Sequence, residues 1–269
     1  MSNLIAKGEV KMKKVAVVIP ARNELDIRKL LEGIFSSVPS GYEVLIVLVV
    51  NNSTPAFEAL ADSVACEDPR VYALQLGQLK SRTFAYAYLE GLKYAVEEVG
   101  ADFVVEMDAG GSHDPDDLPR FVEGLQRADA VFSTRFSHGG RMVHPLQRKV
   151  ASLIGTLLGN LLLGLGRFVP DLTGGYESFR REILQRLFNM VPPDEWLTVS
   201  RGPGHLYQME MRTYLCWMRL RISLVPITMG VGKVRSPQAL GPRKLLQATK
   251  TLLVLRKRRG EFLAQISQT

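Results

Sequence analysis

The chain has little cysteine, and its cysteines belong to no metal-binding cluster. Only two of its 269 residues are cysteine, Cys66 and Cys216, and neither belongs to a CxxC motif or a Cys/His cluster. A disulfide-stapled fold and a structural zinc site are therefore excluded, and a reducing compartment is indicated. Residues 1–14 contain no apolar core region and no small-residue cleavage site, so no secretory signal is predicted and we expect a cytoplasmic protein.

A hydrophobic run long enough to cross a bilayer is also absent. The stretch 150–166 carries no charge, but it is shorter than the about 20 apolar residues of a spanning helix. It also contains four glycines and Asn160. We therefore expect a core or interfacial helix there and not a membrane-spanning one.

Net positive charge is confined to one C-terminal segment. The chain has a formal net charge of +7, and residues 243–259 hold seven basic side chains and no acidic one, so the remainder is close to neutral. This localisation argues against nucleic acid as a partner, because no basic face extends over the whole domain. The segment also contains several leucines. It is either a helix that lies on an anionic membrane surface or an ordinary solvated surface helix.

Short apolar runs alternate with helical patterns in the first half of the chain. Apolar residues recur at i, i+3, i+4 and i+7 after each of the first two runs, and Asp114-Pro115 has the cap and first-turn proline that begin a helix. Strands that alternate with helices form a mostly parallel sheet through right-handed crossovers, so one α/β domain is predicted. The predicted strands are 15–19, 43–50, 70–76, 101–107 and 129–134.

Polar loops follow three of these strands. They read PARNE (20–24), NNSTP (51–55) and DAGGSHDP (108–115). Ligands of such sheets bind beyond the carboxyl ends of the strands, so the three loops together predict a binding site. The first loop lacks the GxGxxG pattern, which sets aside a nucleotide-cofactor oxidoreductase, and no redox cofactor is expected.

Six motifs in register resemble those of family 2 glycosyltransferases, most of all the dolichyl- and polyprenyl-phosphate mannose and glucose synthases. The resemblance extends from about residue 14 to about residue 257, and the shared order of the motifs makes it specific. The motifs are VVIPARNE (17–24), VEMDAGGSHDP (105–115), STRF (133–136), DLTGGYESFRR (171–181), GHLYQMEM (204–211) and LVPITM (224–229).

The resemblance implies a GT-A fold and the inverting transfer of a hexose from a nucleotide-diphosphate sugar, either GDP-mannose or a UDP-hexose. It implies a polyprenyl-phosphate-type acceptor, which a protein peripheral to an anionic membrane surface would reach. The implied organisation is an N-terminal extension (1–13), a glycosyltransferase domain (14–238) with nucleotide-sugar (14–136) and acceptor (137–238) halves, and a basic amphipathic helix with tail (239–269).

The resemblance also implies a donor site. Arg135 would be catalytic and would stabilise the leaving diphosphate, because developing negative charge needs a metal or basic side chains. The family has two aspartates where Asn51-Asn52 stand here, which leaves the base preference open. The expected donor residues are Pro20, Ala21, Arg22, Glu24, Asn52, Asp108, Ala109, Gly110, Arg135, Lys233 and Arg235.

Asp108 matches the first aspartate of the family's metal-binding motif, whereas Gly110 stands where the second aspartate is expected. Mg²⁺ on a sugar diphosphate needs one or two carboxylates beside the phosphates and waters. We therefore expect Asp108 to be a catalytic residue that holds Mg²⁺ or Mn²⁺ weakly, with basic side chains taking a larger share of the charge.

The acceptor side would follow from two further motifs. An acceptor hydroxyl needs a general base, for which Glu210 is the candidate, whereas a phosphate acceptor is already an anion and needs little help. A buried structural role is the alternative interpretation of Glu210. The expected acceptor residues are Thr173, Gly174, Gly175, Arg180 and Gln208.

Two alternatives remain open beside the lipid phosphate. A soluble small-molecule acceptor fits the departures at Asn51-Asn52 and Gly110. A catalytically silent family member that serves as a binding subunit also fits the lost aspartates, although Arg22, Asp108 and Arg135 are retained.

Overall fold

The computed structural model describes residues 12–24, 26–78, 84–200, 204–230 and 242–268. Within them a seven-stranded sheet has the order β3-β2-β1-β4-β7-β5-β8, and every neighbouring pair is parallel except those that involve β7. The predicted α/β class with a mostly parallel sheet is therefore confirmed. The strands are β1 (Lys13–Ala21), β2 (Tyr42–Asn51), β3 (Val71–Gly77), β4 (Phe103–Glu106), β5 (Ala130–Thr134), β7 (Glu177–Arg180) and β8 (Ile222–Pro226).

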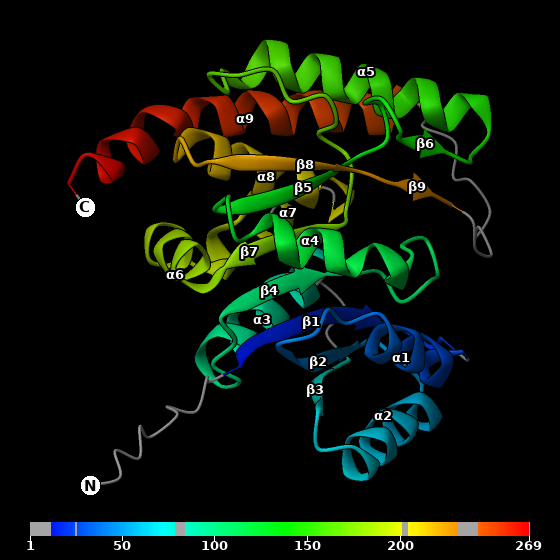
Figure 1. The fold of residues 1–269 in the computed structure, drawn as a ribbon. Coiled ribbons are helices and arrows are strands. Elements are labelled where there is room, and N and C mark those ends of the chain that lie inside the picture. The colour runs from blue at the N-terminus through cyan, green and yellow to red at the C-terminus, as the bar shows by residue number, and fades with distance from the viewer. Residues whose placement is uncertain (1–11, 25, 79–83, 201–203, 231–241, 269) are drawn as a thin grey trace, which may run out of the picture.

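Helices cover both faces of this sheet (Figure 1). The helices α1 (Ile27–Ser36), α2 (Pro55–Glu67) and α4 (Leu118–Gly124) pack on one face, and α3 (Phe84–Glu97), α6 (Arg181–Met190) and α8 (Tyr207–Trp217) pack on the other. Alternate residues of β1 face the two layers, with Val17 in the first core and Val18 in the second. Burial on both sides explains why the central strands are almost entirely apolar.

The antiparallel strand β7 is one of the strands that the sequence pattern did not predict, together with β8, β6 (Arg141–Met142) and β9 (Thr228–Met229). Strand β7 lies between β4 and β5, so Glu177 pairs with Glu106 on one side and with Phe132 on the other. The side chains of Glu106 and Glu177 are thus neighbours in the sheet, and both are buried. The first part of the motif 171–181 therefore lies beside the end of β4 that leads into the Asp108 loop.

Two long helices, α5 (Leu146–Leu163) and α9 (Pro242–Ile266), lie alongside each other over the second core (Figure 1). Leu252, Leu255 and Phe262 of α9 are buried against that core. Of the helices in the described ranges, none is both long and apolar enough to cross a membrane. The expectation of a core or interfacial helix at 150–166 is met by α5, which begins and ends slightly earlier.

Shorter elements complete the description. The parallel pair β6 (Arg141–Met142) and β9 (Thr228–Met229) lies beyond the carboxyl ends of the large sheet (Figure 1). The remaining elements are η1 (Pro115–Asp117), η2 (Pro193–Glu195), α7 (Leu197–Ser200) and η3 (Gly204–Leu206).

Candidate active site

The first two loops at the carboxyl edge are joined to each other. Arg22 donates from Nε to the carbonyl oxygen of Asn52 at 2.9 Å, and Asn23 Oδ1 accepts from the backbone N–H of Thr54 at 2.8 Å. Asn23 and Asn52 both have left-handed backbones, with φ of 61° and 52°. Asparagine tolerates this conformation better than most residues, which explains its place in both tight turns.

The remaining residues of the first loop support this turn. The carboxylate of Glu24 accepts from the backbone N–H of Arg22. Pro20 and Ala21 end β1 opposite Val49 and Val50, and the side chain of Ala21 is buried. The structure thus brings Arg22, Glu24 and Asn52 together at one edge of the sheet, as predicted, while Ala21 belongs to the core.

Asp108 follows β4, and hydrogen bonds with Tyr88 and His113 fix its position. Its Oδ1 accepts from the hydroxyl of Tyr88 at 2.8 Å, and its backbone N–H donates to His113 Nδ1 at 3.0 Å. The second oxygen, Oδ2, lies 3.8 Å from His113 Nε2, and the side chain is 24% exposed. One carboxylate oxygen is therefore oriented by Tyr88 while the group as a whole still reaches solvent.

His113 is a neutral support for this loop. Its ring is buried and stacks on Tyr176 at 4.8 Å between centroids. Burial lowers the pKa of His113, and this effect outweighs the opposite influence of Asp108. Because Nδ1 accepts a hydrogen bond, the proton of the neutral ring is on Nε2, which faces Asp108.

The loop after Asp108 leaves open space. A Cβ placed on Gly110 would have no atom within 4 Å, and Ala109 is half-buried beside it. Asp114 is the helix cap that the sequence predicted, since its Oδ1 accepts from the N–H of Asp116 at 3.1 Å. Among the described residues no group of three or more His, Cys, Asp or Glu side chains is arranged to hold a metal ion. Asp108 is the partly exposed carboxylate at the start of this loop.

Arg135 does not have a free guanidinium. It is buried, and it donates to Asp171 from Nε and Nη2 at 2.7 Å each and to Thr173 Oγ1 at 2.5 Å. Its third nitrogen, Nη1, lies 3.5 Å from Met229 Sδ. The expectation that Arg135 clamps a diphosphate is therefore corrected: its charge is neutralised by Asp171, and it fixes the Thr173 turn.

Another arginine, Arg148, interacts electrostatically with Asp108 and is not among the predicted site residues. Arg148 is an exposed residue at the start of α5; partial desolvation of its guanidinium and the charge of Arg135 lower its pKa, whereas the charge of Asp108 raises it. No ion pair within the described part of the chain involves Arg148. The nearby His144 is buried, and neither of its ring nitrogens has a hydrogen-bond partner among the described residues. Burial lowers the pKa of His144, and the positive charge of Arg148 lowers it further.

The acceptor-side turn is packed so closely that it needs glycine. A Cβ on Gly174 would lie 2.8 Å from Ser133 Oγ, and one on Gly175 would lie 3.1 Å from Gln208 Nε2. Larger side chains at these positions would displace the neighbours on which the turn rests. Thr173, Gly174, Gly175 and Gln208 are therefore brought together, as predicted.

A buried polar network lies under this turn. Arg212 donates from Nε to Glu177 at 2.7 Å, and Tyr207 donates to Glu106 while its ring stacks on Tyr88. Burial raises the pKa of Glu177 to about 7 despite its ion pair with Arg212, because the desolvation of the carboxylate is the larger effect. Burial and the neighbouring Glu177 also raise the pKa of Glu106 well above its usual range.

One predicted residue, Arg180, lies elsewhere in the molecule. Arg180 pairs with Phe103 at the start of β4, the edge of the sheet opposite Asp108, and donates to the carbonyl oxygens of Ala128 and Leu125 at 2.9 and 2.5 Å. It therefore does not contact an acceptor at the site. Lys233 and Arg235 lie outside the described residues.

Glu210 is buried, and both of its carboxylate oxygens accept hydrogen bonds. Its oxygens accept from the backbone N–H groups of Leu197 and Thr198 at 2.9 Å each and from the Thr198 hydroxyl at 2.8 Å. The Tyr214 hydroxyl lies 3.2 Å from the same carboxylate. The proposed general base is thus corrected to the buried structural glutamate that was its alternative, one that anchors α7.

Of the site residues that were not predicted, Arg148 left a signal in the sequence. Arg148 follows a His-Pro pair and precedes the uncharged run of α5, so a basic residue at the helix start was visible. Tyr88 left none, because its contact with Asp108 depends on how α3 crosses the sheet.

Comparison with known proteins agrees with this geometry. Residues 16–188 match the family model described as glycosyl transferase family 2. An undecaprenyl-phosphate mannosyltransferase of Micrococcus luteus is 34% identical over 218 residues, covering 80% of this chain and 83% of that protein. A polyprenol monophosphomannose synthase of Mycolicibacterium smegmatis is 30% identical over 230 residues, covering 82% and 81%.

Solved structures of the same architecture include glucosyl-3-phosphoglycerate synthase from Mycobacterium tuberculosis. Its complex with Mn²⁺, UDP and glucosyl-3-phosphoglycerate superposes with a TM-score of 0.59 at 18% identity, over 92% of this chain and 80% of that one. Its complex with Mn²⁺, UDP-glucose and phosphoglyceric acid gives 0.60 at 19% identity, over 92% and 79%. At this identity the likeness concerns the fold, and it confirms the GT-A expectation.

Proposed function

The chain belongs to glycosyl transferase family 2 and is a glycosyltransferase, and on that premise we propose that it transfers mannose from a nucleotide-diphosphate sugar to a polyprenyl phosphate with inversion. The two relatives that are at least 30% identical carry names for that acceptor class and that sugar. On the same basis, residues 14–238 would be the catalytic unit, and 239–269 would be its basic tail.

The donor would bind at the loops that follow β1, β2 and β4. Arg22 and Asn52 form one side of the site through their 2.9 Å hydrogen bond, and Asp108 forms the other. The neutral amides of Asn51-Asn52 can hydrogen-bond a base through both donor and acceptor atoms, which is compatible with GDP and with UDP.

Asp108 has the features of a ligand for Mg²⁺ or Mn²⁺. One of its oxygens is oriented by Tyr88, the side chain is 24% exposed, and the space beside Gly110 is open. Such an ion, when bound, supplies positive charge to the diphosphate of the donor. With a single carboxylate it would be held more weakly than by two.

Arg148 would stabilise the leaving nucleoside diphosphate. It is exposed, its pKa responds to Asp108 and Arg135, and no ion pair among the described residues occupies it. A guanidinium that is not neutralised by a carboxylate can accept the charge that develops on the leaving oxygen. Arg135 would act on this site only by positioning the Thr173 turn.

The single observation that supports a lipid acceptor is the exposed apolar side of α5. The helix that begins beside Arg148 exposes a row of apolar side chains at helical spacing, from Leu146 (74% exposed) to Leu161 (78% exposed). Apolar rows of this kind bury in the membrane interface. The rest of the row is Val150, Leu153, Ile154 and Leu157.

A phosphate acceptor also agrees with the position of Glu210. A lipid phosphate is already anionic and can attack the sugar carbon without prior deprotonation by a general base. The burial of Glu210 among four hydrogen-bond donors therefore leaves the proposed reaction intact. A hydroxyl acceptor would require a base that Glu210 does not provide.

Binding at the membrane would be peripheral. The helices α5 and α9 lie alongside each other (Figure 1). Beside the apolar row of α5, α9 has the exposed Leu246, Leu253 and Val254, and its sequence adds basic residues. Burial of apolar side chains and attraction to anionic lipid would act together there.

Two assays test the proposed function. In the first, the protein is incubated with labelled GDP-mannose, UDP-mannose or UDP-glucose and undecaprenyl phosphate in vesicles, and the label in the organic phase is counted. We expect lipid-linked mannose from one donor. Label that stays in water, as free sugar or as a soluble glycoside, contradicts the proposal.

The second assay titrates GDP and UDP by calorimetry, with Mn²⁺ and with EDTA. We expect one nucleotide to bind in Mn²⁺ and to bind more weakly in EDTA. Binding that is identical in both conditions contradicts the role of Asp108 as a metal ligand and assigns the diphosphate to the basic side chains.

A further inference from the structure

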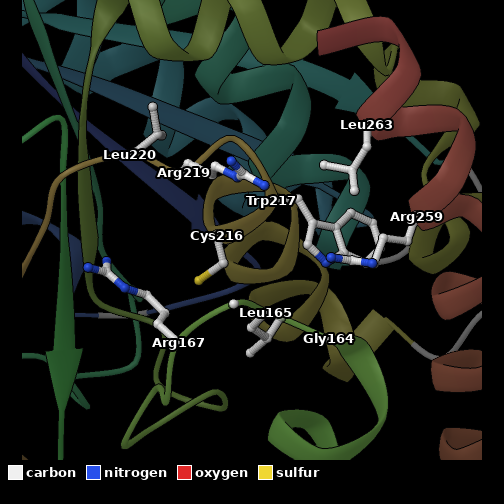
Figure 2. A pocket seen from close by; sticks show the side chains of 10 residues that line it. Gly164, Leu165, Arg167, Cys216, Trp217, Arg219, Leu220, Arg259 and Leu263 are labelled. Carbon is white, nitrogen blue, oxygen red and sulfur yellow. The ribbon is translucent and has the colours of Figure 1, made fainter. Parts of the chain in front are cut away.

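A polar cavity lies far from Asp108. It has a volume of about 300 Å³ and is formed by the turn after α5, the end of α8 and the tail helix α9 (Figure 2). Trp217, Arg219 and Leu220 of its wall directly precede β8, whose first residue Ile222 pairs with Ala130 at the start of β5. The cavity is therefore at the amino edge of the sheet, opposite the loops of the candidate active site.

We propose that this cavity is a binding site for a phosphate ester, distinct from the glycosyl-transfer site. Three arginines from three separate segments line it, Arg167, Arg219 and Arg259, and no acidic side chain does (Figure 2). The guanidinium fork matches phosphate oxygens and forms charge-assisted pairs of hydrogen bonds with them. Three such groups with no carboxylate among them attract an anion.

None of these guanidinium groups is neutralised within the described ranges. No ion pair between described residues includes Arg167, Arg219 or Arg259. The Nε of Arg259 is buried and has no hydrogen-bond partner. A buried N–H without a partner is costly, so it points to a group that binds there.

The backbone around the cavity is shaped to hold these arginines. Arg219 has a φ of 56°, a left-handed conformation that glycine or asparagine usually occupies just after a helix. An arginine in this conformation strains the backbone, because its Cβ is crowded there. Gly164 ends α5 with a φ of 62°, and a Cβ at that position would collide with the guanidinium of Arg256 beside Arg259.

Part of the cavity wall is apolar, which suits the organic group of a phosphate ester better than inorganic phosphate. Leu165, Leu220 and Leu263 line the cavity with the Trp217 ring, whose N–H is fixed on the carbonyl oxygen of Leu163 at 3.1 Å. Cys216 adds no negative charge, because burial raises the pKa of its thiol to about 11. The volume is at the lower end of small-ligand sites, about 300–1,000 Å³. A small phosphate ester or the headgroup of an anionic lipid has this chemistry.

The experiment uses Arg219→Gly, which removes the guanidinium while supplying the residue that a φ of 56° favours. Its melting temperature should equal or exceed that of the wild type. Arg259→Gln is the second variant. Lys257→Gln is the matched control, because it removes one exposed charge from the same helix outside the cavity.

One arm titrates glycerol 3-phosphate by calorimetry, and the other measures flotation with vesicles of phosphatidylglycerol or phosphatidylcholine. Glycerol 3-phosphate that binds at the candidate active site, on the opposite edge of the sheet, should bind equally to every variant. Differences in binding between the variants therefore report on the cavity. We expect saturable binding that weakens about tenfold or more in Arg219→Gly and Arg259→Gln and is unchanged in Lys257→Gln.

The two arms also identify the source of the phosphate. Variant-sensitive binding of glycerol 3-phosphate supports a free ester, and variant-sensitive flotation with phosphatidylglycerol alone supports a lipid headgroup. The proposal is overturned by an absence of saturable binding in both arms. It is equally overturned if Arg219→Gly binds like the wild type, or if Lys257→Gln weakens binding as much as the two cavity variants do.

Discussion

The rim of the candidate active site and the layer beneath it use the same residue types in opposite ways. The rim residues Arg22, Asp108 and Arg148 reach solvent. In the buried polar layer, defined by Arg135, Asp171, Glu177 and Arg212, each charge is paired with another at 2.7 Å. The comparison teaches that an arginine in a motif is a candidate for chemistry only if no carboxylate already neutralises it.

Removal of one partner from the buried layer should have the largest effect. Asp171→Ala leaves Arg135 buried without its carboxylate, so the free energy of unfolding should fall by about 3–5 kcal/mol in urea denaturation. Glu67→Gln, which breaks the exposed pair with Arg28, is the control and should change little. Equal effects in the two variants would remove the distinction between layer and rim.

Changes at the rim should affect activity and spare stability. Asp108→Asn should lower kcat/KM about a hundredfold or more, because under the proposed function the carboxylate that would hold the metal ion loses its charge. The melting temperature should stay close to that of the wild type. Asp114→Asn is the control, since asparagine caps a helix as well as aspartate does. If Asp114→Asn loses the same activity, the role of Asp114 is not capping alone.

The buried layer should also respond to pH. The pKa of Glu177 is about 7 in the folded protein against an ordinary 4.5, so the native state binds more protons than the unfolded state between these values. Its contribution to stability is therefore full below about pH 4.5 and lost as the pH rises through 7. The wild type should lose on the order of 3 kcal/mol relative to Glu177→Gln between pH 4.5 and 8. Parallel curves for the two proteins would contradict this account.

Glu210 distinguishes a structural carboxylate from a catalytic one. Glu210→Gln keeps one oxygen for the Leu197 and Thr198 N–H groups, so we expect about 1–3 kcal/mol of lost stability. The kcat measured well below the melting temperature should remain within a few-fold of the wild-type value. A loss of several orders of magnitude in kcat with normal stability would restore Glu210 as the general base.

The smallest effect is expected at Arg148. Arg148→Gln should lower kcat/KM about tenfold through weaker stabilisation of the leaving group. Arg186→Gln, on α6, is the matched control and should keep full activity. If the two variants behave alike in steady-state kinetics, Arg148 does not act on the diphosphate.

The sequence predicted the first half of the fold well, because apolar runs and helical spacing are local signals. The strands β1 to β5 and the Asp114 cap all lie where the pattern placed them. The antiparallel β7 was not predicted, since four residues of a strand pattern do not indicate which neighbours they pair with. The partners of Arg135 and Arg180 depend on that pairing, so their roles were assigned wrongly. The contact of Tyr88 with Asp108 and the stacking of His113 on Tyr176 were not predicted, because each joins segments that are far apart in the sequence.

The most direct test concerns the link between α5 and the acceptor. Leu157→Glu places a charge in the exposed apolar row, and transfer of mannose is measured to undecaprenyl phosphate in vesicles and to a short-chain, water-soluble prenyl phosphate. We predict that transfer to the vesicle-embedded lipid falls about tenfold or more, while transfer to the short acceptor is maintained. Unchanged transfer to both acceptors would contradict the claim that α5 brings the lipid phosphate to Asp108.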